Sequence, residues 1–569
     1  MKNRTENSIN KKNTEKKIMK IDNKKNEMKK ILVNMFKIIY ILSAVVMTAM
    51  LSNKVTNDLI KVAMVVSLIA NSIIIFKTKM FREVLENKSN FKNIIAGVYT
   101  FLFTRIMLIN FISYKIKDLE ELLIKINIKN IETKAVAIFL AALAAISIFI
   151  IIKYIIIKVE PYCKKIYSSI TSFEKIIFSI LTCVGLIFIV LIYNKTNVFD
   201  KAVYKGSMQY YDVVYTTDTA ALVDEEAHIN ITHPENDLRQ PLFAMCNMPF
   251  TLVTDVIARE FKDVKDISSI LLNLSQLIML NIAVILMSKL MKLKNKNQML
   301  FIGIYILSYP YLLFALNIEQ YIATFFWLIV YIYLYIEHDE NNDLALVATT
   351  GSLLTSAVIG ITYFRKNLKT TILKLIRCVA GFILAVIIFG NIGSVSDVLK
   401  TAEKYTEWTG KTVQMSDKIN QYSNFVTNCF VAPKAEIRFK ESSNIPTYAI
   451  DDDIKFNYVG LAIFILVIIS YIINRKDKLA KISFGWCMYS IIILLIVGWG
   501  TKENGLILYA LYFSWAFVIM IYKLIEKVFA KKTALFTGAQ LSILVCIAYI
   551  NIKAILDLVQ FGIVHYPYK

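Results

Sequence analysis

Apolar residues in this chain gather into long runs separated by short polar connections, without the alternation that is typical of half-buried strands. Runs of about 18–23 apolar residues recur from Ile31 to Ile552, and about 20 residues in a helix are enough to cross a bilayer. Outer-membrane barrels would instead show short alternating segments. The pattern therefore predicts an all-α, polytopic helical membrane protein.

The apolar runs are the candidate membrane spans. They cover residues 31–51, 59–76, 94–113, 135–157, 175–193, 268–291, 300–316, 318–336, 344–364, 372–393, 457–473, 482–500, 504–522 and 535–552. Between 113 and 135 the pattern is amphipathic instead, which is typical of a helix lying on the membrane surface.

Positive charge assigns sides to the connections, because lysine and arginine favour the cytoplasmic ends of short loops. Basic connections lie at residues 77–92, 158–169, 292–298, 474–481 and 523–532, and a basic tail precedes the first span. If every run crosses the membrane once, all basic connections before residue 343 fall on the cytoplasmic side, but the agreement fails after that residue. The basic residues 365–371 would then fall outside, so one predicted crossing is not a full span.

The run LALVATTGSLLTSAVIGITYF (344–364) is the best candidate for the false crossing. Its centre, TTGSLLTS, combines a glycine with several hydroxyl residues, as expected where two half-helices meet in a turn. Such broken backbone is tolerated at membrane depth only where protein or a water-filled cavity covers it. We therefore predict about 13 transmembrane helices plus one re-entrant pair, with two long extracytoplasmic loops at 194–267 and 394–456.

Composition agrees with this assignment, since 56% of the 569 residues are hydrophobic. The net charge of +22 does not indicate a nucleic-acid partner, because the positive residues lie between the apolar runs and in residues 1–30. That tail has few large apolar residues and is predicted to be disordered and cytoplasmic. The seven cysteines form no CxxC motif, and only Cys246 and Cys429 fall in the two long polar segments, where they could pair.

These features divide the chain into five predicted parts. They are the tail 1–30, a four-helix membrane block 31–174, a core 175–393 that contains the first outer loop, the second outer loop 394–456, and C-terminal membrane helices 457–569.

The first outer loop holds most of the candidate chemistry. Asp218, Asp224 and Glu225 form an acidic group, and the stretch HINITHPENDLRQPLF (228–243) follows it. After Pro241 the sequence becomes apolar for about 17 residues, which is short for a span and suits an interfacial helix.

This arrangement resembles the first outer loop of GT-C glycosyltransferases, in which an acidic loop leads through a histidine- and proline-rich turn into an interfacial helix. Here HPENDLRQPLF stands in place of the family's turn. YPYLLFALNIEQYIATFFWL, the GSLLTS helix and the second outer loop continue the resemblance over roughly residues 175–393, with an echo at WGTKENGLILYALYFSW (499–515). The chain departs from the family in its four preceding helices and in the spacing between the acidic residues and the turn.

The resemblance implies a multispan enzyme that transfers a sugar from a polyprenyl-phosphate donor to a cell-surface glycan, lipid or protein. Such an enzyme would act on the outer face of a bacterial plasma membrane. It needs membrane lipid and the lipid-linked sugar as partners and no cofactor, while a divalent metal held by the carboxylates stays open. Protein partners are not indicated by the sequence.

Sugar transfer needs a carboxylate that accepts the acceptor's proton and a cation near the phosphate leaving group. Asp218 and Asp224 are the alternative candidates for the base, with Glu225 beside them. Arg239 is the candidate for phosphate contact, because its planar fork can bind two oxygens. The remaining substrate-binding candidates are His233, Glu235, Asp237, Gln240, Glu319 at the start of a span, and Lys502 in the turn GTKEN.

Other interpretations of the same residues stay open. Arg239 could pair with Asp237 or Glu235 instead of a ligand. His228 and His233 are five residues apart, which is not the spacing of one helical face, so no metal site is predicted. A flippase, transporter or polymerase of lipid-linked sugars is the alternative function. A transporter is expected to show internal repeats and paired broken helices, whereas the sequence indicates one broken helix.

Overall fold

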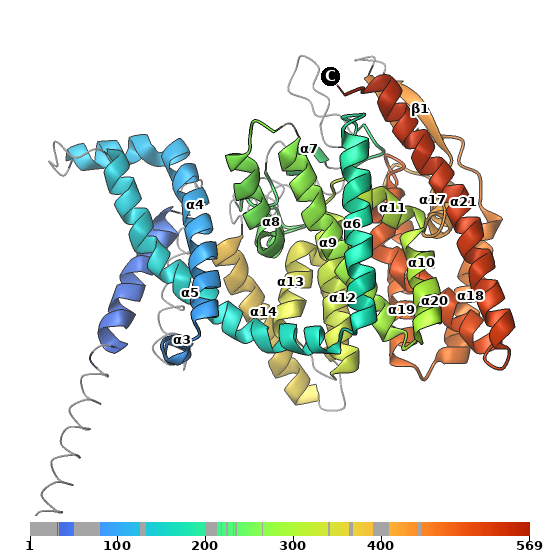
Figure 1. Ribbon diagram of the computed structural model, residues 1–569, viewed down its shortest axis with the longest axis horizontal. Helices are drawn as coiled ribbons and strands as arrows, with labels where there is room; N and C mark the ends of the chain where they lie inside the picture. Colours follow the sequence, from blue (N-terminus) through green and yellow to red (C-terminus); the bar gives the residue numbers. More distant parts are fainter. Residues whose placement is uncertain are drawn as a thin grey trace, which may run out of the picture. The chain divides into compact units, whose positions relative to one another are not determined.

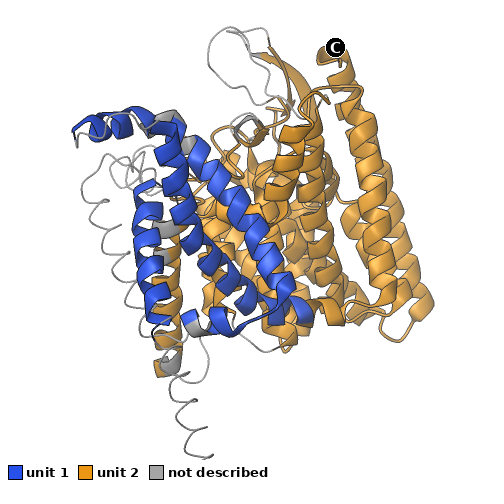
Figure 2. Cartoon of the chain, turned by 60° about the vertical axis from the view of Figure 1, so that its left-hand side comes forward, with its two compact units in different colours: residues 1–164 blue, residues 165–569 orange. Residues whose placement is uncertain are grey.

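The computed structural model describes residues 31, 33–50, 80–125, 133–199, 213–217, 219–223, 226–231, 233, 236–264, 266–338, 342–363, 368–390, 409–440 and 445–568. The chain forms two compact units, residues 1–164 and 165–569 (Figure 2). The division falls inside a helix, upstream of the domain boundary predicted at residue 174.

Unit 1 contains a helix over Val33–Met50, α3 (Met80–Glu86), α4 (Asn90–Lys125) and most of α5 (Thr133–Ser169). The predicted span 59–76 lies outside the described residues. Two helices are longer than the sequence predicted. The first part of the predicted amphipathic segment, residues 114–125, continues α4 and does not form a separate helix.

The basic connection predicted at residues 158–169 is also wrong, because α5 runs through it with Pro161 inside the helix. Charged pairs support this extension. Lys164 Nζ lies 2.9 Å from Glu160 Oε1 one turn away, and Lys158 Nζ lies 2.6 Å from Glu83 Oε2 of α3. Pairs four residues apart stabilise a helix, so charge alone did not mark its end.

Unit 2 is a helical bundle (Figure 1). Its long helices are α6 (Ser172–Tyr193), α9 (Ile267–Leu290), α10 (Asn295–Ile306), α11 (Tyr309–Leu316), α12 (Tyr321–Glu337), α14 (Leu368–Phe389), α18 (Tyr458–Asn474), α19 (Lys478–Ser490) with the π-helical turn η3 (Ile491–Ile496), α20 (Ala510–Val528) after the 3₁₀ turn η4 (Leu506–Tyr509), and α21 (Thr533–His565). The apolar stretches of α9 and α20 are 72% and 89% buried, so these helices form the core. The apolar stretches of α6 and α21 are only 11% and 17% buried, so these helices lie at the outside of the bundle.

Within the described residues, eight helices are long and apolar enough to cross a membrane, or nine if one bent pair counts as a single span. Two more apolar helices, α12 and α18, are slightly shorter. The chain is therefore a mostly helical, multi-pass membrane protein. α21 extends 13 residues beyond the predicted span end at residue 552, because Leu558 and Phe561 continue its buried face.

The connections of unit 2 gather at its two ends (Figure 1). We call one the basic end; it holds residues 169–171, 291–294, 475–477 and 529–532. The other, the loop end, holds the described connections 213–217, 226–231, 236–242, 317–320, 409–414, 429–434, 451–457 and 497–505. The basic connections 292–298, 474–481 and 523–532 thus share one end, as the charge pattern predicted.

The helical break predicted within TTGSLLTS lies at Leu353, which is extended between α13 (Asp343–Ser352) and the 3₁₀ helix η2 (Leu354–Tyr363). The two arms run side by side, because Gly360 of η2 packs against Leu346 of α13. The Thr362 hydroxyl of η2 also meets the Tyr331 hydroxyl of α12 at 2.5 Å. At the start of α13, Asp343 pairs with Arg377 near the middle of α14. The arms therefore form a hairpin whose tip points away from the basic end.

A second interruption was not predicted. The run at 300–316 is split into α10 and α11, which meet at an angle of 66°. Ser308 caps the break: its hydroxyl donates to the Tyr305 carbonyl at 2.6 Å, and Pro310 stands in the first turn of α11. Proline is favoured there because its missing N–H has no partner in a first helical turn.

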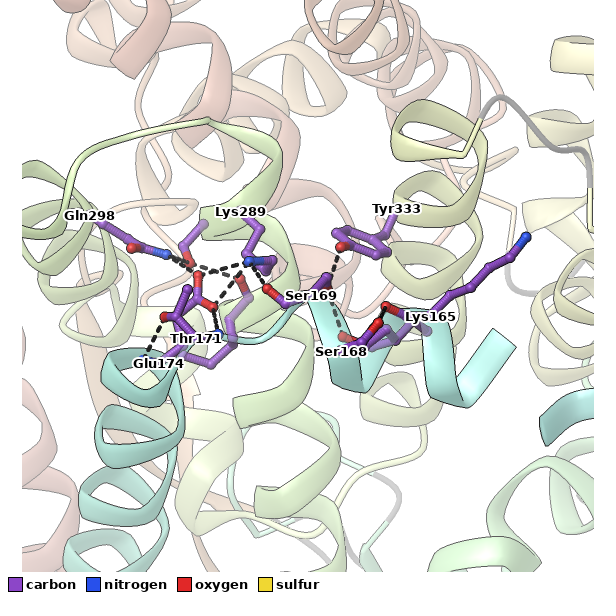
Figure 3. Close-up of polar contacts among 11 residues, drawn as sticks. Lys165, Ser168, Ser169, Thr171, Glu174, Lys289, Gln298 and Tyr333 are labelled. Atoms are coloured by element: carbon purple, nitrogen blue, oxygen red, sulfur yellow. Dashed lines mark hydrogen bonds and ion pairs between the residues drawn. The ribbon is translucent and has the colours of Figure 1, made fainter. Parts of the chain in front are cut away.

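A polar cluster joins five helices at the basic end (Figure 3). Lys289 Nζ donates to Glu174 at 3.1 and 3.2 Å and to the Ser169 carbonyl at 2.6 Å. Gln298 Nε2 donates to Glu174 Oε1 at 2.7 Å, and the Thr171 amide donates to Glu174 Oε2 at 2.7 Å. Tyr333 adds a bond to the Ser169 hydroxyl at 2.6 Å. Every oxygen of the buried Glu174 carboxylate is thereby satisfied, as a buried charge requires.

The loop end contains short helices and one small β-hairpin, while the chain as a whole is mostly helical, as predicted. This end contains α7 (Thr219–Val223), α8 (Phe243–Glu260), α17 (Met415–Asn428) and an antiparallel hairpin of β1 (Ala435–Lys440) and β2 (Ile445–Ile450). The first outer loop joins this sheet, because Tyr215 N donates to Tyr448 O at 2.7 Å and Tyr448 N donates to Val213 O at 2.8 Å. The helix predicted after Pro241 is α8.

Candidate functional site

A cavity of about 200 Å³ opens within unit 2 where four separate parts of the chain meet. Its lining comes from the first outer loop (238–240), the start of α12 (320 and 321), the hairpin tip (353–355) and the last part of the chain (493, 499, 509, 512 and 513). The wall is mostly apolar or aromatic, with a few polar side chains. This composition is typical of small-molecule sites.

Arg239 lies at this cavity with its guanidinium held by Asp237. Arg239 Nε is 2.9 Å from Asp237 Oδ2, and the same carboxylate accepts the Arg239 amide at 2.7 Å. The side chains are 29% and 13% exposed, so the pair is partly shielded from water. The ion pair of Arg239 with Asp237, which the sequence left open, is thus formed. It holds the Nε side of a guanidinium that lines the cavity.

Gln240, the next residue, has an unsatisfied polar atom. The residue is only 3% exposed, and its Oε1 has no hydrogen-bond partner. A buried acceptor without a partner costs about 1–3 kcal/mol. Because Gln240 lines the cavity, a ligand donor placed there would satisfy this oxygen.

Glu319 is fully buried beside the cavity wall. The side chain of Gln276 in α9 holds its backbone on both sides, accepting from Glu319 N at 3.0 Å and donating to Glu319 O at 2.9 Å. Its carboxylate accepts the Gln320 amide at 2.7 Å. Gln320 and Tyr321 line the cavity, so Glu319 is one residue behind the surface that a ligand would meet.

Aromatic rings form the opposite wall. Tyr321 and Tyr509 meet edge to face with centroids 5.2 Å apart, and Tyr512 and Phe513 do so at 4.7 Å. Trp499 completes the wall from the turn that contains Lys502. Rings of this kind offer rigid apolar faces to a ligand.

Other predicted residues have different positions. Asp218, Asp224, Glu225 and Glu235 lie outside the described residues. His233 is buried in a turn that is closed by bonds between His233 N and Asn230 O and between Asn236 N and His233 O. Lys502 is exposed. Neither His233 nor Lys502 lines the cavity.

The parts of the chain that the structure describes contain no group of three or more His, Cys, Asp or Glu residues placed to hold a metal ion. All seven cysteines are free, so the pairing of Cys246 with Cys429 considered from the sequence is not formed.

Sequence reasoning missed Lys418 in α17. This lysine is only 9% exposed and packs against the backbone of Gly410 and Gly498, beside the cavity-lining Trp499. Its backbone amide donates to Gln414 O at 3.1 Å, but within the described residues its ammonium forms no hydrogen bond or ion pair. A lysine in a polar segment carries no sequence signal of burial, so only the fold identifies it as a second cation near the site.

His228 gives the first outer loop a pH dependence. It is buried with Nδ1 2.9 Å from the Leu222 carbonyl, and burial lowers its pKa to about 4, with nearby Glu226 opposing and Arg259 assisting the shift. Because the unfolded chain binds this proton near pH 6.5, the free energy of unfolding should fall by up to about 3 kcal/mol as the pH drops from 6.5 to 4.

We therefore expect the melting temperature in detergent to fall more between pH 7 and pH 4.5 for the unmodified protein than for His228→Gln. Equal falls in the two proteins would show that another group controls the acid response.

Comparison with protein-family models, with curated proteins and with solved structures found no match to this chain. The resemblance to GT-C glycosyltransferases therefore stays a prediction.

Proposed function

We propose that this protein is a membrane-embedded, GT-C-like glycosyltransferase. It would transfer a sugar from a polyprenyl-phosphate donor to a cell-surface acceptor, with its site at the loop end facing the outside of a bacterial plasma membrane. The full proposed topology is about 13 transmembrane helices with the α13–η2 hairpin as the re-entrant pair.

One observation carries the proposal. Four stretches carried the resemblance to GT-C enzymes. They are LRQ of the first outer loop, EQY at the start of α12, the centre of GSLLTS, and WGTKEN with the residues after it. Each contributes residues to the same cavity, although they lie up to 275 residues apart in sequence, from 238 to 513. Unrelated loops of a scaffold would have no reason to converge in this way.

The lining suits the proposed donor chemistry. Arg239 supplies a cation at the cavity, and negative charge grows on the phosphate as the sugar leaves. The buried oxygen of Gln240 can accept a bond from a sugar hydroxyl, while the aromatic wall fits the apolar faces of a sugar ring or lipid.

The proposed base follows from chain connectivity. Asp218 precedes Thr219, whose hydroxyl donates to the Ile318 carbonyl at 3.1 Å. Ile318 lies two residues before Gln320 in the cavity wall. Thr219 therefore lies beside the cavity wall, and Asp218 directly precedes it in the sequence, so we propose Asp218 as the base in preference to Asp224.

Asp218→Asn should abolish most transfer while the protein remains folded, since an amide cannot accept the acceptor's proton. Asp224→Asn is the matched comparison and should retain more activity. Radiolabelled sugar transfer from a polyprenyl-phosphate donor in membranes measures both. Full activity in both variants would exclude Asp218 and Asp224 as the catalytic base.

The side on which Leu368 lies tests the topology. A cysteine at 368, in a chain whose native cysteines are replaced, should react only with reagents that reach the cytoplasm, because the hairpin returns the chain to that side. A cysteine at Asn420 should react only from outside. Outside labelling at 368 would make 344–364 a full span.

A transporter or flippase of lipid-linked sugars is the second candidate, and the break between α10 and α11 favours it. With the α13–η2 hairpin, unit 2 has two interrupted elements, and transporters often bind their substrates at such breaks. A flippase would move the lipid-linked sugar between leaflets without releasing polyprenyl phosphate, which separates the two functions.

A further inference from the structure

The segment Arg239–Leu242 is tied to the tip of the α13–η2 hairpin by two backbone hydrogen bonds. Leu354 N donates to Arg239 O at 2.7 Å, and Leu242 N donates to Gly351 O at 2.9 Å. The two bonds hold both ends of a four-residue segment. Arg239 and Gln240, the polar residues of the cavity wall, lie within it.

Close packing against Gly351 makes this attachment possible. A methyl group on Gly351 would lie 2.6 Å from Leu242 Cβ and 2.8 Å from its Cδ1. Cβ cannot swing away as a side-chain tip can, so the backbones would have to separate. Leu242 is 2% exposed and packs with Cys246 and Val386, which leaves it little room to move.

A second glycine supports the same segment from α14. A methyl group on Gly390, which directly follows that helix, would lie 2.7 Å from the Pro241 carbonyl oxygen and 2.6 Å from that of Val386. Two glycines from different elements thus approach one four-residue segment.

We propose that the α13–η2 hairpin is a positioning element, and that Gly351 and Gly390 are positioning residues that hold Arg239 and Gln240 toward a ligand in the cavity. The hairpin tip also lines that cavity through Leu353, Leu354 and Thr355, so one rigid unit sets both the wall and its polar groups. This positioning role rests on the proposed function only in taking the ligand to be a polyprenyl-phosphate sugar.

Gly351→Ala should separate the loop from the hairpin without unfolding the bundle. Hydrogen exchange should show that the amides of Leu242 and Leu354 lose protection together by tenfold or more. Gly360→Ala is the matched control in the same hairpin, because its new methyl group would find its nearest atom at 3.8 Å, and it should leave both amides protected.

Catalysis gives the second measurement. Misplacement of a binding group by about 1 Å can cost about 100-fold in rate. With polyprenyl-phosphate glucose as the donor probe, Gly351→Ala should lower kcat by about that factor while changing KM much less.

The outcomes are separable. Unchanged exchange at the Leu242 and Leu354 amides in Gly351→Ala overturns the positioning role whatever the protein catalyses. Loss of protection without any transferase activity in the unmodified protein would keep the attachment and reject the proposed function. If Gly351→Ala does not fold, hydrogen exchange is measured on Gly390→Ala instead, which should lower the protection of the Leu242 amide in the same way.

Discussion

Replacing Arg239 with glutamine is expected to lower sugar transfer from a polyprenyl-phosphate donor about 100-fold in kcat, because the phosphate would lose its cation as charge develops on it. Arg239 lines the cavity, and Asp237 fixes its Nε while the hairpin fixes its backbone. Glutamine keeps hydrogen-bonding groups without the charge, so the variant isolates the electrostatic contribution. Steady-state transfer in nanodiscs is the measurement.

Arg259 provides the matched control. It is also an arginine beside the first outer loop, on α8, but its guanidinium is committed to Asp255 at 2.8 Å and Glu226 at 2.7 Å, and it does not line the cavity. Arg259→Gln should therefore keep kcat within a few-fold of the unmodified protein. Arg239→Lys should fall between the two, because lysine keeps the charge but lacks the planar fork. Equal losses for Arg239→Gln and Arg259→Gln would indicate a general effect on loop folding.

Replacing Glu174 with alanine is expected to destabilise the protein by about 3–5 kcal/mol, because it leaves the Lys289 ammonium without its counter-charge. The Glu174 and Lys289 side chains are 3% and 16% exposed, and Gln298 and the Thr171 amide would also lose their acceptor (Figure 3). A fall in thermal stability, measured by tryptophan fluorescence in detergent, reports the loss.

Two variants separate the ion pair from general effects of charge. The pair of Lys292 with Glu337 lies at the same end, but Lys292 is 71% exposed, so Glu337→Ala should cost less than about 1 kcal/mol. Adding Lys289→Met to Glu174→Ala removes the isolated charge and should recover part of the stability. No recovery in the double variant would mean that hydrogen bonds, and not the buried charge, control the effect.

Much of the helical architecture could be predicted from the sequence, because bilayer-length apolar runs and clusters of basic residues are strong signals. The break within TTGSLLTS was predicted because a full crossing there would put the basic residues 365–371 on the outer side. In the structure, α13 ends just before Leu353. The bend between α10 and α11 was not predicted, because YILSYPYLLF is continuously apolar around its single proline. The β1–β2 hairpin was missed because polar segments of mixed composition carry little periodicity.

The candidate site could be predicted in part. Arg239, predicted as a phosphate contact, and Gln240, predicted as a substrate-binding residue, line the cavity, and Glu319 lies directly behind its wall. The burial of Lys418, the exposure of Lys502 and the role of Gly351 depend on tertiary contacts that no local pattern encodes. Gly351 was noted only as a helix breaker, whereas its packing against Leu242 is a contact between residues more than 100 positions apart.

Release of polyprenyl phosphate from a polyprenyl-phosphate hexose decides between transfer and transport, and it is measured with the purified protein in proteoliposomes that are supplied with a cell-envelope fraction as the acceptor. We expect the hexose to be transferred to the acceptor, polyprenyl phosphate to accumulate in the leaflet that faces the loop end, and Arg239→Gln to slow both about 100-fold. Movement of intact donor between leaflets, with no polyprenyl phosphate released from any of a panel of hexose donors, would contradict the proposed transfer and identify the protein as a carrier of lipid-linked sugars.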